Sequence, residues 1–196
     1  MLESILGGVA ISIGCVAYLS VGGGITGAFL FSIGLCLICA RKLNLFTGKV
    51  CYLDKSNIMN IMLVLIGNMI GVFIISLLIR HTSTQLIDRA NEIMTAKSHG
   101  WLNIILKGIM CNVLIFYAVD TYNKNTIPDI FKWSVLILCV MVFILSGYEH
   151  CIANAFYSML SGHIGGLRFV ALNVLGNTIG GVLIYRLGRN YGNSCC

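Results

Sequence analysis

Long apolar runs separated by short polar segments dominate the pattern of this chain. The runs lie near residues 5–21, 25–40, 58–79, 102–119, 131–147 and 167–187, and glycines, charges or polar clusters bound each of them. A helix needs roughly 20 apolar residues to cross the hydrocarbon core of a membrane. Because the runs are continuous rather than alternating, the pattern favours helices over a transmembrane β-barrel. It predicts an all-α membrane protein with six transmembrane helices in a single domain, residues 1–196.

The second and fifth apolar runs are each followed by a polar break and then by a further short apolar segment. These segments are Thr47–Leu53 and Cys151–Leu160. Interrupting a helix at membrane depth frees backbone N–H and C=O groups, which is tolerated only where they are buried in protein or line a cavity. Two interrupted helices therefore indicate a pathway for a solute.

A five-residue motif occurs twice in the chain. Gly67–Gly71 (G-N-M-I-G) recurs as Gly176–Gly180 (G-N-T-I-G), displaced by 109 residues, and the breaks keep almost the same spacing, so that 45–47 maps just after the second break, onto 154–156. The motif can be a chance recurrence of small-residue packing. We instead expect two repeats of three spans, at about 5–80 and 101–188, each with its middle span interrupted. Duplication of an odd number of spans inverts the second half, and the interrupted helices of such repeats meet near the midplane.

Composition supports a membrane protein and excludes several other classes. The chain is 58% hydrophobic and 10% charged, with a mean hydropathy of +0.90. The net charge of +6 lies mostly in loops, without the clustered basic face of a nucleic-acid-binding protein. Most of the nine cysteines lie inside apolar runs, and the pair Cys36 and Cys39 lacks partners at zinc-site spacing. We expect no cofactor, no metal and no nucleic-acid partner.

Glu149 and His150 are the outstanding ionisable residues, because they directly follow the fifth apolar run. Asn154 lies one helical turn beyond His150 and can share its face. Ionisable groups within spans are expensive to bury and are functional candidates by default. His150 can face a pore and give a hydrogen bond, or a proton, to a passing anion, since imidazole titrates near neutrality. Alternatively, the two residues form a satisfied pair in the core.

Several cations compete as the partner of Glu149. Lys97, just ahead of the fourth span, is either a solvated loop charge or folds inward to pair with Glu149 through Asn154. Arg41 and Lys42 flank the first break, and in an inverted repeat that break approaches the same midplane. A lone carboxylate at this depth would be strongly destabilising. We expect the pair with Lys97.

Four strings, in this order and spacing, resemble the formate/nitrite transporter family over the whole chain. They are Asn44–Gly48 (N-L-F-T-G), Lys107–Asn112 (K-G-I-M-C-N), Ser146–Asn154 (S-G-Y-E-H-C-I-A-N) and Gly176–Gly181 (G-N-T-I-G-G). The resemblance implies an aquaporin-like fold and a homopentamer with one pore in each protomer. Two departures bear on gating and substrate range. We expect no amphipathic N-terminal helix before the first span, and Arg41 and Lys42 stand where relatives usually have small or neutral residues.

The resemblance also implies roles for individual residues. Thr47 would offer its hydroxyl to the solute and His150 would be the central histidine, while Lys97 would pair inward near Glu149 and Asn154. Asn112, in the second string, is also a candidate pore residue. Leu45 and Phe46 would narrow the pore. Phe31 and Leu35 would complete that constriction, and Phe143 would belong to the other one.

These expectations combine into one functional hypothesis. The chain is expected to move small monovalent weak-acid anions of the formate, nitrite, hydrosulfide and acetate class across the cytoplasmic membrane of a bacterium, with both termini in the cytoplasm. Its other partners would be protons and membrane lipid. A bare anion in a dry constriction has an idealised cost on the order of 20 kcal/mol, so we expect the anion to be protonated during passage. Two alternatives stay open: a neutral-solute pore of the aquaporin type, and a membrane-embedded enzyme with Glu149 and His150 as its acid–base pair.

Overall fold

Helices make up the regular structure of the residues that the computed structural model describes, which are 1–97, 100–163 and 165–192. The elements are α1 (Leu2–Ser20), α2 (Gly24–Phe31), α3 (Ile33–Ala40), α4 (Phe46–Lys49), the short 3₁₀ helix η1 (Val50–Tyr52), α5 (Ile58–Thr82), α6 (Thr84–Ala96), α7 (Trp101–Asn123), α8 (Asp129–Leu145), α9 (Cys151–Ser161) and α10 (Gly166–Gly192). By length and composition, α1, α5, α7 and α10 can each cross a membrane, and Gly24–Ala40 is a shorter apolar stretch.

Each apolar run of the sequence is helical, and both breaks lie where the sequence predicts them. The second run forms α2 and α3, and the chain then breaks before α4 begins at Phe46. The fifth run forms α8, and the chain breaks again before α9 begins at Cys151. The two short apolar segments after the breaks are therefore α4 with η1, and α9.

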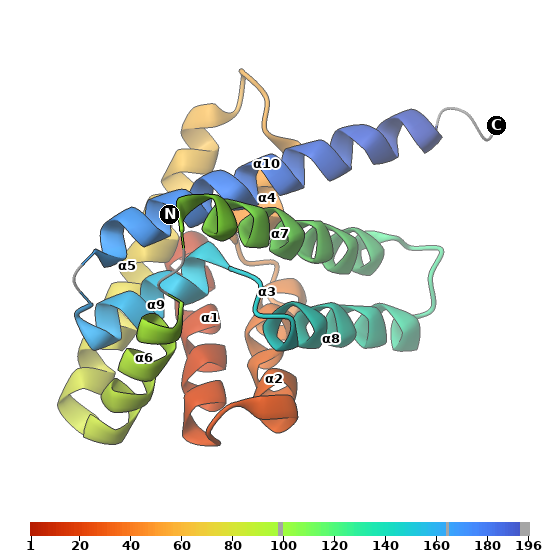
Figure 1. Ribbon diagram of the computed structural model, residues 1–196. Coiled ribbons are helices and arrows are strands. Elements are labelled where there is room, and N and C mark those ends of the chain that lie inside the picture. Colours follow the sequence, from red (N-terminus) through yellow and green to blue (C-terminus); the bar gives the residue numbers. More distant parts are fainter. Residues whose placement is uncertain (98–99, 164, 193–196) are drawn as a thin grey trace.

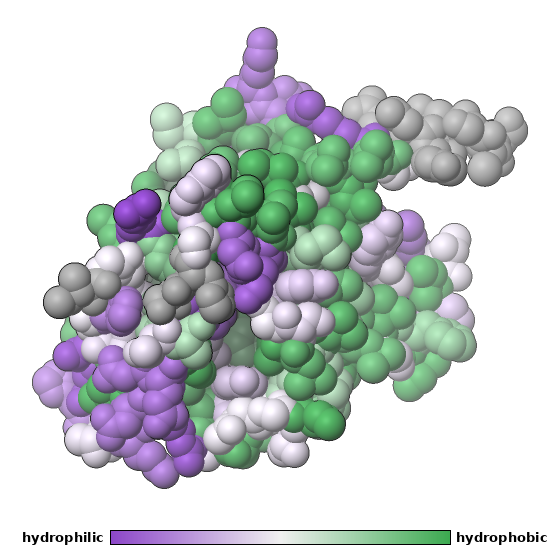
Figure 2. Space-filling model, viewed as in Figure 1, coloured by the Kyte–Doolittle hydropathy of each residue, from purple (hydrophilic) through white to green (hydrophobic). Residues whose placement is uncertain are grey.

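The prediction missed α6, an amphipathic helix between the third and fourth spans. Its buried residues Leu86, Ala90 and Met94 recur every four positions. The Ser83 hydroxyl accepts a hydrogen bond from Leu86 N–H at 3.3 Å and so caps the first turn. Polar side chains gather at the lower left of Figure 2, where Figure 1 places α6.

Two pairs of long helices pack against each other. In the first half α1 packs along α5, and in the second half α7 packs along α10 (Figure 1). Glycines make both contacts possible, since a Cβ on Gly71 would lie 2.1 Å from Ile5 O, and one on Gly180 would lie 2.3 Å from Ile109 O. The repeated glycines thus allow the close helix packing that small residues provide in membranes.

Candidate pore site

An asparagine side chain on α5 holds the first break. Asn68 Nδ2 donates to Ser4 O at 2.6 Å and to Asn44 O at 2.9 Å. Its Oδ1 accepts from Phe46 N–H at 2.8 Å. A side-chain amide carries both donors and an acceptor, so it can satisfy the groups that an interrupted helix frees on both sides of the break.

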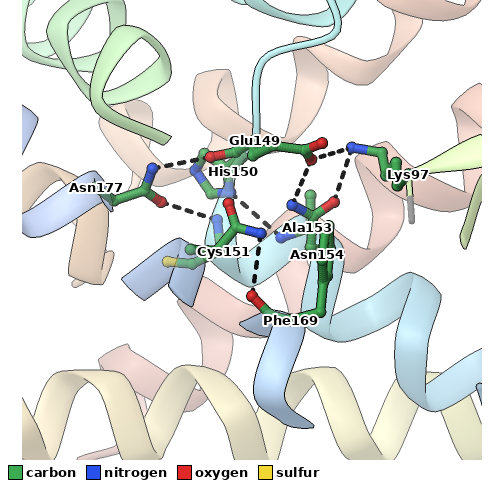
Figure 3. Close-up of polar contacts among 9 residues, drawn as sticks. Lys97, Glu149, His150, Cys151, Ala153, Asn154, Phe169 and Asn177 are labelled. Carbon is green, nitrogen blue, oxygen red and sulfur yellow. Dashed lines mark hydrogen bonds and ion pairs between the residues drawn. The ribbon is translucent and has the colours of Figure 1, made fainter. Parts of the chain in front are cut away.

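Asn177 on α10 holds the second break in the same way (Figure 3). Its Nδ2 donates to Gly108 O at 2.8 Å and to Glu149 O at 2.9 Å, and its Oδ1 accepts from Cys151 N–H at 2.9 Å. Both asparagines come from the repeated G-N-x-x-G motif, so the motif has a bonding role as well as a packing role. Sequence reasoning noticed the repeat but missed this role.

The paired contacts also correct the alignment of the two breaks. Phe46 and Cys151 donate to the two equivalent asparagines, so the breaks are displaced by 105 residues, whereas the motifs are displaced by 109. The predicted match of 45–47 with 154–156 is therefore wrong by one helical turn. The physical reason is that the second half has four more residues between its break and its motif than the first half.

The two breaks begin with the same helix-ending turn but with different residues. After α3, Leu43 N–H donates to Ile38 O at 2.9 Å, and Lys42 takes a left-handed φ of 53°. After α8, Tyr148 N–H donates to Phe143 O at 2.9 Å, and Gly147 has a φ of 66°. This is the Schellman arrangement, in which glycine is the usual left-handed residue. Lys42 therefore has the left-handed backbone conformation that a glycine, Gly147, has at the corresponding turn after α8.

His150 and Thr47 meet between the two breaks and are both buried. The Nε2 atom of His150 lies 3.1 Å from Thr47 Oγ1, while Nδ1 accepts from Ala153 N–H at 3.2 Å and caps α9. Because Nδ1 accepts, the neutral ring carries its proton on Nε2 and donates it to Thr47 Oγ1. The hydroxyl proton of Thr47 then has no partner among the residues that the structure describes. Asn112 Nδ2 donates to Thr47 O at 3.1 Å, so Asn112 holds Thr47 from behind.

Aromatic side chains close the space on one side of this pair. Phe143 stacks on His150 with ring centroids 5.8 Å apart, and Phe31 contacts Phe143 edge-on at 5.9 Å. Phe31 therefore groups with Phe143, which corrects its assignment to the same constriction as Leu35. One helical turn separates Phe31 from Leu35 and places them at successive depths.

Two cavities approach the constriction from opposite sides. The first, which we call the Lys97 vestibule, has a volume of about 290 Å³ and reaches Phe31, Phe143 and His150. The second, the Lys42 vestibule, has a volume of about 280 Å³, contains Lys42 and Lys49, and reaches Leu35 and Leu45. Phe46 is buried but is not among the described residues that line either vestibule.

The predicted ion pair is present in the Lys97 vestibule (Figure 3). Lys97 Nζ contacts Glu149 Oε2 and also donates to Asn154 Oδ1 at 3.0 Å. Asn154 Nδ2 in turn donates to Glu149 Oε2 at 2.9 Å. The Glu149 side chain is 1% exposed and that of Lys97 is 21% exposed. The competing cation Lys42 lines the opposite vestibule.

Two arginines, Arg80 and Arg89, bond to helix ends. Arg80 Nη1 donates to Leu160 O at 2.8 Å, at the end of α9. Arg89 Nη1 donates to Ser20 O at 3.0 Å, at the end of α1. Guanidinium groups at helix C-termini satisfy free carbonyls and complement the helix dipole. Within the described part of the chain, no group of His, Cys, Asp or Glu side chains is arranged to hold a metal.

Comparisons with known proteins show what this chain is similar to. A family model described as formate/nitrite transporter matches residues 1–191. The formate channel FocB of Escherichia coli (strain K12) is 29% identical over 181 residues, covering 79% of this chain and 64% of that protein. The formate channel FocA of Haemophilus influenzae is 26% identical over 149 residues, covering 67% of this chain and 52% of that protein. The chain thus spans about half to two thirds of the length of these curated relatives.

The fold is also that of a solved relative. A structure described as a pentameric formate channel with formate bound has a TM-score of 0.84 and is 27% identical, with 98% of this chain and 95% of that chain covered. The family match, the relatives and this structure extend over most or all of the described chain, and the two clamped breaks lie within the matched region. This protein is a member of the formate/nitrite transporter family.

Proposed function

We propose that this protein is a channel or transporter for small monovalent weak-acid anions of the formate, nitrite, hydrosulfide and acetate class. In this proposal six spans form two inverted repeats, five copies assemble into a pentamer in the bacterial cytoplasmic membrane, and both termini face the cytoplasm. The observation that carries the proposal is the buried contact between His150 and Thr47, which lies between two vestibules and behind apolar side chains.

The central histidine acts as a hydrogen-bond donor in this proposal. Its Nδ1 is occupied by Ala153 N–H, so Nε2–H is the atom that faces Thr47 and a passing solute. Releasing that proton would leave an anionic ring in a buried site, which is unfavourable. The proton that neutralises the anion therefore joins it from vestibule water, crosses with it, and leaves on the far side. One proton accompanies each anion.

In this proposal the apolar constriction excludes the charged form of the solute, and the polar midpoint binds the neutral form. The constriction is apolar, and burying a bare anion there costs several kcal/mol even after relaxation. A neutral acid avoids this cost and needs only hydrogen-bond partners at the midpoint, where His150 and Thr47 supply them. Asn112 positions Thr47, while Leu35, Leu45 and Phe46 narrow the path on the Lys42 side. The match of this chain to the formate/nitrite transporter family supports neither alternative, the aquaporin-type pore or the membrane-embedded enzyme.

Flux into proteoliposomes tests the proposal. Formate, nitrite, acetate and hydrosulfide should enter, and water and glycerol should not enter faster than through protein-free vesicles. The informative variant is His150→Asn, because asparagine is a favoured N-cap and preserves the start of α9. We expect the pentamer to persist by native mass spectrometry while anion flux falls by tenfold or more, about 1.4 kcal/mol. Unchanged formate and nitrite flux in this variant would remove His150 from the pathway, and rapid glycerol flux by the wild type would favour the aquaporin alternative.

A further inference from the structure

Among the residues that the structure describes, three with formally charged side chains line the Lys97 vestibule: Lys97, Lys107 and Glu149. Lys97 and Glu149 form an ion pair, and Asn154 bonds to both of them. The pair is neutral as a unit, and Glu149 repels any anion that approaches the Lys97 ammonium. Within the described lining of this vestibule, the remaining positive charge is that of Lys107.

Lys107 lies deep within a transmembrane helix. It precedes Gly108 on α7, whose carbonyl shares the Asn177 amide with the carbonyl of Glu149. The Lys107 carbonyl itself accepts from Glu149 N–H at 3.3 Å. These bonds place the backbone of Lys107 at the level of the second break. The residue is half-buried at the depth where the candidate pathway narrows.

The ammonium group of Lys107 has no ion pair or side-chain hydrogen bond within the described ranges 1–97, 100–163 and 165–192, whereas Arg80 and Arg89 cap helix ends. An ionisable group inside a span is expensive and is normally paired or functional. If Lys107 served only for packing, its methylene groups would lie along apolar surface and its ammonium charge would have no role. An unpaired ammonium in a water-accessible cavity instead attracts anions.

We propose that Lys107 is the anion-binding cation of the Lys97 vestibule, and that it holds a small monovalent anion before the anion reaches Phe31 and Phe143. The inference rests on the proposed function and adds a residue to it. It also divides two roles: Lys97 neutralises Glu149 and positions Asn154, whereas Lys107 concentrates the substrate. Screening by salt should weaken this concentration, because the vestibule is open to water.

The test measures formate flux into proteoliposomes against formate concentration and ionic strength at fixed pH. In Lys107→Met the half-saturating concentration should rise by about tenfold, as expected for loss of one nearby charge in a partly hydrated site. Flux at saturating formate should stay within about twofold of wild type, and the salt dependence of flux at low formate should flatten. Lys107→Arg keeps the charge and should resemble wild type. Lys124→Met removes an exposed charge elsewhere and should also resemble wild type.

Each other outcome overturns the inference. Unchanged half-saturation and salt dependence in Lys107→Met would mean that its charge does not act on the substrate. Equal impairment of the Met and Arg variants would assign Lys107 to packing. If Lys107→Met does not assemble, the same prediction applies to Lys107→Gln. If neither of these variants assembles but Lys107→Arg does, the charge of Lys107 is needed for the structure and the inference is overturned. Wild-type protein that takes up none of the anions would refute the proposed function itself, a result distinct from wild-type uptake with an unaffected Met variant.

Discussion

Replacing Asn177 by leucine, which has a similar volume, should destabilise the protein through the second break. The change removes the acceptor of Cys151 N–H and a donor to Glu149 O, and it also removes the link to Gly108 O. Asn177 is fully buried, so water cannot replace these partners. Leaving a buried polar group unsatisfied costs about 1–3 kcal/mol. Counting Cys151 N–H and Glu149 O, and allowing the Gly108 carbonyl to stay satisfied within α7, the loss is about 2–6 kcal/mol.

Asn173 provides a matched control on the same helix. It lies about one turn before Asn177 and is also fully buried. Its Nδ2 makes one local bond, to Phe169 O at 3.3 Å, and its Oδ1 has no partner among the described residues. Asn173→Leu therefore removes an unsatisfied acceptor together with a weak bond. We expect the free energy of unfolding to stay within about 1 kcal/mol of the wild-type value, and any change to be an increase rather than a decrease.

The assay compares thermal unfolding of the two variants in the same detergent, alongside formate flux after reconstitution. Asn177→Leu should unfold well below wild type and lose flux, because the Glu149–Cys151 backbone is no longer held. Asn173→Leu should match wild type in both measurements. If the two leucine variants are equally stable, Asn177 does not clamp the break, and the reasoning from unsatisfied backbone groups is wrong for this site.

Two further pairs of substitutions test the charge and the backbone strain at the breaks. Lys97→Met should destabilise the protein by up to about 3 kcal/mol, since Glu149 is left as an unpaired buried carboxylate, and adding Glu149→Gln should restore most of that loss in thermal unfolding. A single variant as stable as the double variant would contradict the pairing. Lys42→Gly should raise stability by about 1 kcal/mol by relieving a left-handed φ, and Gly147→Ala should lower it by a similar amount. A loss of stability in Lys42→Gly, or a gain in Gly147→Ala, would refute the argument from backbone strain.

The spans and their interruptions were predictable because both follow from the bilayer. Its thickness sets the length of each apolar run, and the polar breaks at 41–45 and 146–150 stand out against those runs. The α6 helix was not predictable by the same reasoning. Its apolar face consists of few residues among many polar ones, so hydropathy treats the segment as a loop although its four-residue periodicity is helical.

Partner assignments were harder to predict than helices. The pair of Lys97 with Glu149 could be proposed because few cations lie near a buried carboxylate. The grouping of Phe31 with Phe143 could not, because it depends on how deep α2 and α8 lie relative to each other. The hydrogen bonds by which Asn68 holds the first break were also not predicted, although the presence of Asn68 in a repeated motif was a usable signal. A side-chain amide beside glycines at a helix crossing is well placed to bond to a neighbouring break.

The start of α9 explains why the charge of the substrate should be handled in the vestibules rather than at the midpoint. A helix N-terminus ordinarily offers free N–H groups to an anion. Here Cys151 N–H is taken by Asn177, Ala153 N–H by His150 Nδ1 and Asn154 N–H by His150 O. The Thr47 hydroxyl can donate to a solute at this point, and His150 Nε2–H can do so in exchange for its bond to Thr47 Oγ1; both donors are neutral. Such a pair can hold an acid by hydrogen bonds but cannot compensate a full negative charge in an apolar constriction. Attraction of the anion therefore belongs outside the constriction, where Lys107 stands without an acidic partner.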